Sequence, residues 1–327
     1  MTYIISEIAS AHNGKADNLK KLIDASINSN ADAVKIQIFK TENLLQKKHK
    51  NYKLFKKIEI SHEKIFNILK RVSDKKIDLI LEPYDFDSLK FIKKIKKFHS
   101  IKIPTSDTKN LKFIKEASKV KKKIFLGIAG LKLNEIKKII NMLKKNQLNL
   151  VHGFQSFPTK FLDTDVSRIS ILKKIFKKQV CYADHSDSEN LGICYSLCSL
   201  AIINGASIIE KHITLNRKNK GPDYHSALNP NEFKNFVDFF KKYELLIKNK
   251  KFKLSNAEHI YSTSFKKYPL ASRDLQKGTI INEKDINFKR IDANKKNFLI
   301  DNYYELLGKK LLEKKKFDTP FFKKNFK

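Results

Sequence analysis

The feature that most constrains this chain is a repeated alternation of short apolar runs, rich in β-branched residues, with longer segments of helical periodicity. The predicted strands are 2–9, 33–38, 77–82, 100–105, 123–127, 148–153, 179–184 and 207–212, and the predicted helices are 18–30, 61–76, 86–97, 110–120, 133–146, 166–177, 189–204 and 230–247. Such units repeated over about 250 residues predict an α/β fold, a closed (β/α)8 TIM barrel. A doubly wound sheet is the alternative, disfavoured because no glycine-rich phosphate loop follows the first strand.

The charge of the chain raises the question of a nucleic-acid partner. Its 327 residues have a formal net charge of +34. The lysines are spread over predicted helix surfaces, as at Lys93, Lys94 and Lys96, whereas a nucleic-acid site concentrates basic residues on one surface. We therefore expect no specific nucleic-acid partner, although this charge would attract anionic substrates.

Hydrophobic runs and cysteines indicate the compartment. No apolar run approaches the roughly 18 residues of a membrane span, and no basic segment precedes an apolar one at the start of the chain. Cys181, Cys194 and Cys198 are too few for a disulfide framework and are expected to be reduced core residues. We expect a cytoplasmic protein without a membrane partner.

Two histidines form a candidate metal site. The runs 182–186 and 207–215 each begin as a buried strand and end in polar residues, which places His185 and His212 at matching ends of two strands. Neighbouring parallel strands lie about 5 Å apart, so the two imidazoles can converge on one cation if the strands are adjacent. The alternative is a pair of histidines that bond strand-end carbonyl groups in a packed loop.

Other polar side chains also follow predicted strands, at the end of a barrel where active sites lie. They are Glu7, Lys35, Gln37, Glu82, Lys102, Thr105, Ser106, Asp107, His152, Gln155, Asp184 and Glu210. Alternation along 33–38 directs Lys35 into the barrel, where a buried lysine needs an anionic partner. That partner is either a carboxylate such as Glu7 or a bound phosphate, and a second lysine, Lys102, favours an anionic ligand.

The pattern changes after the eighth unit. Residues 1–248 are predicted to form the barrel, and residues 249–266, which lack clean periodicity, are predicted to be a linker packed on it. Residues 267–327 contain short strands and turns and form a predicted small β-rich domain. Because about 60 residues is small for independent stability, we expect this domain to dock on another surface.

Several motifs, in order and spacing, resemble those of the sialic acid synthase family, which makes nonulosonic acids from phosphoenolpyruvate and an N-acyl hexosamine. They are Ser6-Glu7-Ile8, His12-Asn13-Gly14, Asp32-Ala33-Val34-Lys35-Ile36-Gln37, Tyr182-Ala183-Asp184-His185-Ser186, Gly205-Ala206-Ser207-Ile208-Ile209-Glu210-Lys211-His212 and Gly221-Pro222-Asp223. The tail from Ala271 to Arg290 resembles the antifreeze-like (SAF) domain of the family. The likeness spans almost the full chain.

The resemblance implies roles for the matching positions. His185 and His212 would hold a divalent metal, Mn or Mg, while Lys35 and Lys102 would bind the phosphate and carboxylate of phosphoenolpyruvate. The SAF domain would reach over the barrel of a partner subunit in a domain-swapped homodimer. The remaining residues expected to bind phosphoenolpyruvate or the acylated aminosugar are Gln37, Thr105, Gln155, Asp184, Glu210, Asp223 and Arg290.

The expected chemistry is the formation of a carbon–carbon bond. Two histidine ligands leave open positions on a metal for a Lewis-acid role toward the sugar aldehyde. C3 of phosphoenolpyruvate attacks the aldehyde carbon, water adds to C2, and phosphate leaves by C–O cleavage. Glu7 is the predicted catalytic carboxylate that positions or deprotonates the water, with Asp107 as the second candidate, since burial raises the pKa of a carboxyl group.

The chain also departs from the family pattern. Gly127-Ile128-Ala129-Gly130 stands where the family has Ser-Thr-Gly, and Leu81-Glu82-Pro83 where it has Ser-Thr-Pro. The lost hydroxyl groups would donate to phosphoenolpyruvate, a role that N–H groups of the first turn could take over. Glu82 would repel an anion unless it faces a lysine or the sugar. Two alternatives therefore stay open: another phosphoenolpyruvate-using aldol synthase, and a non-catalytic protein that binds sugars or polyanions.

Overall fold

The computed structural model describes residues 2–72, 75–247, 252–291 and 299–326. The chain divides into two compact units, Met1–Lys248 and Asn249–Lys327. Within the described residues, every helix is too short or too polar to cross a membrane.

The first unit is a closed parallel barrel, which confirms the predicted (β/α)8 fold. Its strands are β1 (Tyr3–Glu7), β2 (Ala33–Ile38), β3 (Asp78–Pro83), β4 (Ser100–Ile103), β5 (Lys123–Gly127), β6 (Leu148–His152), β7 (Gln179–Asp184) and β8 (Ile208–Ile213). Each strand pairs with the next, and β1 pairs with β8 to close the barrel, while the short β9 (Ala227–Leu228) pairs with the end of β8.

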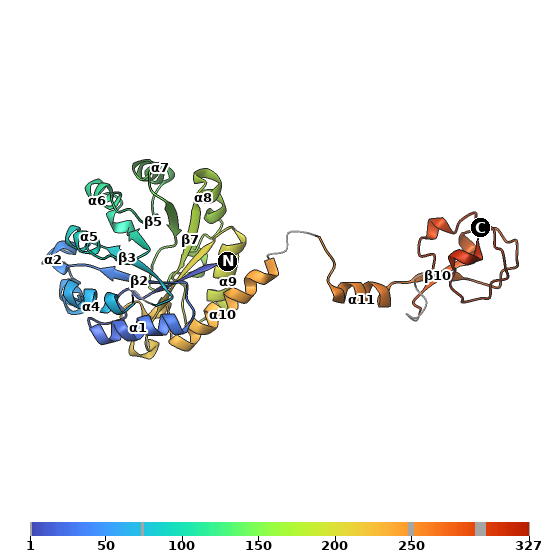
Figure 1. Ribbon diagram of the computed structural model, residues 1–327, viewed down its shortest axis with the longest axis horizontal. Helices are drawn as coiled ribbons and strands as arrows, with labels where there is room; N and C mark the ends of the chain where they lie inside the picture. Colours follow the sequence, from blue (N-terminus) through green and yellow to red (C-terminus); the bar gives the residue numbers. More distant parts are fainter. Residues whose placement is uncertain (1, 73–74, 248–251, 292–298, 327) are drawn as a thin grey trace. The chain divides into compact units, whose positions relative to one another are not determined.

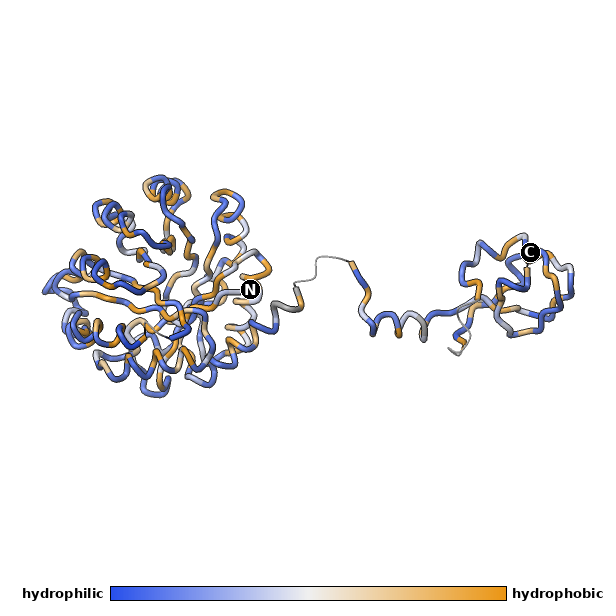
Figure 2. Tube along the Cα trace, in the orientation of Figure 1, coloured by the Kyte–Doolittle hydropathy of each residue, from blue (hydrophilic) through white to orange (hydrophobic). Residues whose placement is uncertain are grey.

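Helices surround the strands (Figure 1). They are α1 (Ala16–Asn28), α4 (His62–Val72), α5 (Phe86–Ile92), α6 (Leu111–Ala117), α7 (Leu133–Met142), α8 (Arg168–Phe176), α9 (Leu191–Ile203) and α10 (Pro230–Ile247). Two short helices, α2 (Thr41–Leu44) and α3 (Tyr52–Ile58), lie in a segment that the sequence analysis left as a loop. Hydrophobic and hydrophilic residues alternate along the helices (Figure 2), the pattern of a helix with one face on the strands.

An apolar layer inside the barrel places the polar residues above it. The layer consists of Ile5, Ala33, Ile80, Phe125, Val151, Cys181, Ala183 and Ile208. Side chains two positions apart along a strand share a face, so Glu7 follows Ile5, Lys35 follows Ala33 and Glu82 follows Ile80 on the inner face. The inner side chains therefore become polar toward the carboxyl ends of the strands, the end that carries the active site in TIM barrels.

The second unit has its own small core. Strand β10 (Tyr268–Ala271) pairs antiparallel with β11 (Ile286–Lys289). Its buried apolar residues are Ala271, Leu275, Ile281, Ile286, Ile300, Leu306, Leu311, Phe321 and Phe326. The antiparallel sheet agrees with the predicted β-rich domain.

A helix that the sequence analysis missed lies within the predicted linker. It is α11 (Asn256–Phe265), and Ser255 caps its first turn. Ser255 Oγ accepts a hydrogen bond from Glu258 N at 3.2 Å, and a Glu258 carboxylate oxygen accepts one from Ser255 N at 2.6 Å. This reciprocal Ser-x-x-Glu capping box is a readable helix-start signal.

Candidate active site

The adjacent strands β7 and β8 bring His185 and His212 together. Their ring centroids lie 5.2 Å apart, with an angle of 57° between the ring planes. The His185 Nδ1 atom lies 3.1 Å from the carbonyl oxygen of Ala183. Because a carbonyl oxygen only accepts, Nδ1 carries the proton and Nε2 keeps a free lone pair.

Both imidazoles are held in the neutral form. Burial lowers the pKa of His185 to about 4, against the opposing charges of Glu210 and Asp184. Burial, together with neighbouring His185, holds the pKa of His212 well below its usual value. Neutral imidazole is the form that ligates a metal, so both rings are ready to do so at pH 7.

The surroundings of the two rings fit a divalent cation. Glu210 Oε2 is buried, and no described group donates a hydrogen bond to it. The negative charge of Glu210 acts on both imidazoles. Two neutral imidazoles with ring centroids 5.2 Å apart suit Mn²⁺ and related ions, and the charge of Glu210 favours a cation there.

A second group of ligand atoms does not form a metal site. Asp184, Cys194 and Cys198 lie close together in the described residues. Asp184 Oδ2 already accepts hydrogen bonds from Lys211 Nζ at 2.6 Å and Ser186 Oγ at 2.9 Å. The Lys211 ammonium group therefore occupies the position that a cation would need.

Two lysines and three carboxylates meet inside the barrel; we call Glu7, Lys35, Glu82, Lys102 and Glu210 the inner charge cluster. Lys35 Nζ lies 2.7 Å from Glu210 Oε1 and 3.3 Å from Glu82 Oε2, and it also contacts Glu7 Oε2. Lys102 Nζ lies 3.1 Å from Glu210 Oε1 and 3.5 Å from Glu82 Oε1. The carboxylate partner expected for Lys35 is present, and Glu82 faces both lysines.

The charges of the inner charge cluster are coupled. Burial raises the pKa of Glu210, but Lys102 and Lys35 outweigh burial and hold that pKa well below its usual value. Burial lowers the pKa of Lys35 despite Glu210 and Glu82, whereas the same two carboxylates raise the pKa of Lys102 in spite of its burial. Because three carboxylates face two ammonium groups, the cluster has one negative charge in excess.

A cavity of about 1000 Å³ has mostly apolar walls, to which several of the predicted site residues contribute polar groups. Its lining includes Gln37, Tyr84, Gln155 and Asp223. Gln155 Nε2 donates a hydrogen bond of 2.6 Å to Asp223 Oδ1, while burial raises the pKa of Asp223. The structure thus brings three predicted substrate-binding residues to one space large enough for a sugar.

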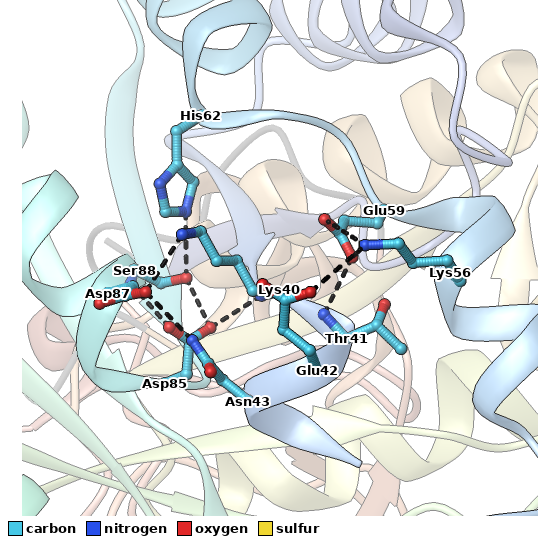
Figure 3. Close-up of polar contacts among 10 residues, drawn as sticks. All are labelled: Lys40, Thr41, Glu42, Asn43, Lys56, Glu59, His62, Asp85, Asp87 and Ser88. Carbon is cyan, nitrogen blue, oxygen red and sulfur yellow. Dashed lines mark hydrogen bonds and ion pairs between the residues drawn. The ribbon is translucent and has the colours of Figure 1, made fainter. Parts of the chain in front are cut away.

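Polar contacts hold the loop that forms one wall of this cavity (Figure 3). Lys40 N donates to Asp85 Oδ2 at 2.8 Å, and Lys40 Nζ donates to Asp87 Oδ2 at 3.1 Å. Thr41 N donates to Glu59 Oε2 at 2.9 Å. These bonds fasten the β2–α2 connection to the β3–α5 connection and to the end of α3, so the wall that includes Leu44 is fixed.

Asp184 does not lie where the sequence analysis expected a substrate ligand. It is fully buried, and its carboxylate contacts Lys211 Nζ and Cys194 Sγ of α9. Along β7 the inner-layer residue is Ala183, so its neighbour Asp184 points to the outer face of the barrel. Its bond to Lys211 joins β7 to β8 beside the two histidines.

Asp107, the second catalytic candidate, lines another cavity. This cavity of about 480 Å³ also includes Asp85, Ser106 and Asn110. Asp107 accepts hydrogen bonds from Asn110 Nδ2 at 3.2 Å and Ser106 Oγ at 3.1 Å, and burial raises its pKa. Glu7, by contrast, belongs to the inner charge cluster.

Thr105 lies against the glycine that replaces a hydroxyl-bearing residue. A Cβ atom at Gly127 would be 2.6 Å from Thr105 Oγ1 and 2.8 Å from Thr105 N. Glycine is therefore required at position 127 in this packing, and the Thr105 hydroxyl is adjacent to the space that a side chain at 127 would occupy. The N–H of Ile128 is already bonded to Val151 O at 3.1 Å, so it is not one of the expected replacement donors.

Two residues remain to be located. Arg290 follows β11 in the second unit, and its guanidinium carbon lies 5.0 Å from the centroid of the Phe265 ring of α11. Tyr84, which the sequence analysis missed, lines both cavities, and burial followed by the charge of Glu82 raises its pKa well above the usual value. Its position two residues beyond Glu82 was the available signal.

The chain is similar to known proteins in sequence and in fold. The NeuB family model matches residues 22–281. An N,N'-diacetyllegionaminic acid synthase from Campylobacter jejuni is 30% identical over 327 residues, covering 94% of this chain and 95% of that protein. One of the same name from Legionella pneumophila is 27% identical over 305 residues, covering 87% and 84%. The crystal structure of an N-acetylneuraminic acid synthetase from Leptospira borgpetersenii shares the fold, with a TM-score of 0.72, 24% identity and coverage of 81% and 92%.

Proposed function

This chain belongs to the NeuB family of synthases, and we propose that it condenses phosphoenolpyruvate with an N-acyl hexosamine to give a nonulosonic acid and phosphate. The observation that carries the proposal is the presence, inside one barrel, of two adjacent neutral imidazoles and two lysines that share a carboxylate. The first pair suits a divalent cation and the second suits an anion. The reaction needs both, because it joins an aldehyde to an anionic phosphate ester.

Lys35 and Lys102 bind phosphoenolpyruvate through its phosphate and carboxylate groups. Both ammonium groups contact Glu210 Oε1, at 2.7 Å and 3.1 Å, so one small anion can reach the two of them. Lys102 is 12% exposed and Lys35 is 1% exposed, so the anion meets Lys102 first. The Thr105 hydroxyl beside Gly127 is the neutral donor for the same anion.

His185 and His212 hold Mn or Mg. The bound ion would supply Lewis-acid polarisation of the open-chain sugar aldehyde. The role of the chain is to keep both rings neutral and oriented. The Ala183 carbonyl oxygen fixes the His185 ring, and the Asp184–Lys211 pair fastens the two strands that carry the rings.

The proposed condensation forms a carbon–carbon bond and breaks a carbon–oxygen bond. C3 of phosphoenolpyruvate bonds to the aldehyde carbon, a water oxygen bonds to C2, and the C2–O bond to phosphate breaks. The aldehyde oxygen gains a proton, and the hydroxyl at C2 loses its proton as the ketone forms. Glu7 receives the proton of the water; Ala9 N, at 2.7 Å from Oε1, and Lys35, which contacts Oε2, orient its carboxylate.

The sugar binds in the larger cavity, against Gln155 and Asp223. The cavity of about 1000 Å³ exceeds the needs of phosphoenolpyruvate alone. The C. jejuni relative is an N,N'-diacetyllegionaminic acid synthase, and that acid has two N-acetyl groups. We therefore propose a 2,4-diacetamido-6-deoxy hexose as the substrate, with N-acetylmannosamine as the competing candidate.

Phosphate release tests the proposal. The full-length protein is incubated with phosphoenolpyruvate, Mn²⁺ and one sugar at a time. Release with the diacetamido sugar, and little release with N-acetylmannosamine, is expected. Release with N-acetylmannosamine alone would keep the reaction class and change the substrate. No release with any N-acyl hexosamine, or equal release without sugar, would refute the condensation.

The second unit completes the enzyme in the proposed homodimer. Residues 249–266 link it to the barrel, and residues 267–327 form the SAF domain, which offers Arg290 to the sugar of the partner subunit. The exposed Phe288 and Phe317 are candidate docking residues. Mixing Arg290→Ala with a barrel variant such as His212→Ala should restore activity if the domain is swapped. Two inactive variants that stay inactive after subunit exchange would refute the swap.

A further inference from the structure

Glu82 has a position in the inner charge cluster that the proposed function does not use. Its carboxylate contacts both lysines with different oxygens, Oε2 to Lys35 Nζ at 3.3 Å and Oε1 to Lys102 Nζ at 3.5 Å. Strand β3 lies between β2 and β4, the strands that carry the two lysines, so Glu82 bridges them from the strand between. The two cations therefore already have an internal anion.

Glu82 is the most loosely held carboxylate of the cluster. Glu210 Oε1 lies closer to each lysine, at 2.7 Å and 3.1 Å. The Glu82 side chain is 1% exposed, and its contacts with the two lysines, at 3.3 Å and 3.5 Å, are the longest ion pairs of the cluster. Because the attraction between opposite charges weakens with distance, Glu82 is the member that a bound anion displaces most easily.

The numbers of opposite charges in the cluster also single out Glu82. Three carboxylates face two ammonium groups. Without Glu82, two carboxylates would balance two lysines. Adding a substrate phosphate and carboxylate to the present cluster places like charges within a few Å in a water-poor site, where repulsion is strong.

We infer that Glu82 sets the affinity for phosphoenolpyruvate. The substrate binds to Lys35 and Lys102 only when it displaces the Glu82 carboxylate from them. The inference rests on the proposed function in taking phosphoenolpyruvate as the anion. It also explains how a carboxylate occupies a position where the sequence analysis expected a hydroxyl donor. Glu82 therefore competes with the substrate for the two ammonium groups and stays paired with them until the substrate binds.

Direct binding of phosphoenolpyruvate tests the inference without turnover. Full-length protein with Mn²⁺ and no sugar is titrated by calorimetry, as wild type, Glu82→Gln and Glu82→Thr. Both variants remove the charge, and the glutamine keeps the shape. At least tenfold tighter binding than wild type is expected for each, equivalent to about 1.4 kcal/mol.

The matched control is Asp78→Asn. Asp78 begins the same strand, at the opposite end of the barrel, and bonds Tyr3 and His99 instead of the cluster. Its replacement removes the same charge and should leave phosphoenolpyruvate affinity within twofold of wild type. Equal tightening in Asp78→Asn and Glu82→Gln would reduce the effect to net charge and overturn the inference.

The remaining outcomes separate this inference from the proposed reaction. Unchanged or weaker binding by Glu82→Gln, with wild type releasing phosphate as proposed, overturns the inference and leaves the reaction standing. If wild type binds no phosphoenolpyruvate and releases no phosphate, the proposed function fails, and titration with inorganic phosphate decides the inference. Tenfold tighter phosphate binding by Glu82→Gln supports it, and any smaller change refutes it. A higher KM for the sugar with unchanged phosphoenolpyruvate affinity would assign Glu82 to the sugar instead.

Discussion

Two buried groups of charges lie on opposite faces of the same barrel wall, and their bonding differs. On the outer face, Asp184 and Lys211 form a one-to-one pair at 2.6 Å, and Ser186 and Tyr182 complete the hydrogen bonds of the carboxylate. On the inner face, the cluster has three carboxylates for two lysines, and one oxygen each of Glu7, Glu82 and Glu210 lacks a hydrogen-bond donor among the described residues.

This difference in bonding indicates that the Asp184–Lys211 pair is structural and that the inner charge cluster is functional. A balanced, fully bonded pair is satisfied by the fold and has no capacity left for a ligand. A cluster with unequal numbers of opposite charges and incomplete hydrogen bonds is destabilising, and such an arrangement is typical of sites that bind or react. The comparison makes opposite predictions for the same type of substitution on the two faces.

The largest expected effect is on stability, from the outer pair. Asp184→Asn leaves the Lys211 ammonium buried without its counter-ion, which should lower the free energy of unfolding by about 3–5 kcal/mol. Urea denaturation of the full-length protein measures this free energy. The double variant Asp184→Leu/Lys211→Met should recover much of the loss, because no buried charge remains. If Asp184→Asn were as stable as wild type, the Asp184–Lys211 pair would not be a structural pair.

The next effect is on catalysis, from the inner cluster. Glu7→Gln keeps the size of the side chain and removes the base, so kcat should fall about 10²-fold or more while phosphoenolpyruvate still binds. Steady-state phosphate release measures kcat. Glu116→Gln, which removes a carboxylate from a surface ion pair with Lys93, is the control and should retain activity. Full turnover by Glu7→Gln would remove Glu7 from the mechanism.

A smaller effect is the pH dependence of stability. The pKa of His12 and of His185 is lowered to about 4 by burial, below the value of about 6.5 in the unfolded chain. Between these values the unfolded state binds protons that the folded state does not, so stability falls as pH decreases from 6.5 toward 4. Each histidine contributes up to about 1.4 kcal/mol per pH unit. Metal-free wild type and His12→Gln are denatured at pH 7 and at pH 5. The free energy of unfolding should decrease less between these pH values in the variant than in wild type.

The smallest expected effect is on stability, from Glu82 of the inner charge cluster. Glu82→Gln removes the surplus charge of the inner cluster, so stability should stay unchanged or rise by about 1 kcal/mol, whereas the corresponding change at Asp184 is strongly destabilising. Thermal denaturation of the two variants side by side measures the contrast. A loss of several kcal/mol in Glu82→Gln would mean that Glu82 is a structural partner like Asp184.

Much of the architecture could be predicted from the sequence. Periods of 2 and 3.6 residues located the eight strands and their helices, because periodic burial is a local property of the chain. The same periodicity brought His185 and His212 to neighbouring strand ends. The two short helices α2 and α3 were missed, since they are fixed by contacts such as Thr41 N to Glu59 Oε2, which join different parts of one connection.

The sequence by itself determined the barrel, the order of its strands and the residue types at their carboxyl ends. Only the tertiary structure decided which of those groups meet: that Lys35 reaches Glu210, 175 positions away, that Glu82 faces both lysines, that Asp184 points outward and that Thr105 approaches Gly127. The physical reason is that hydrophobic periodicity follows from the local geometry of the backbone. Pairing of buried charges depends on how the closed barrel aligns strands that are remote in the chain.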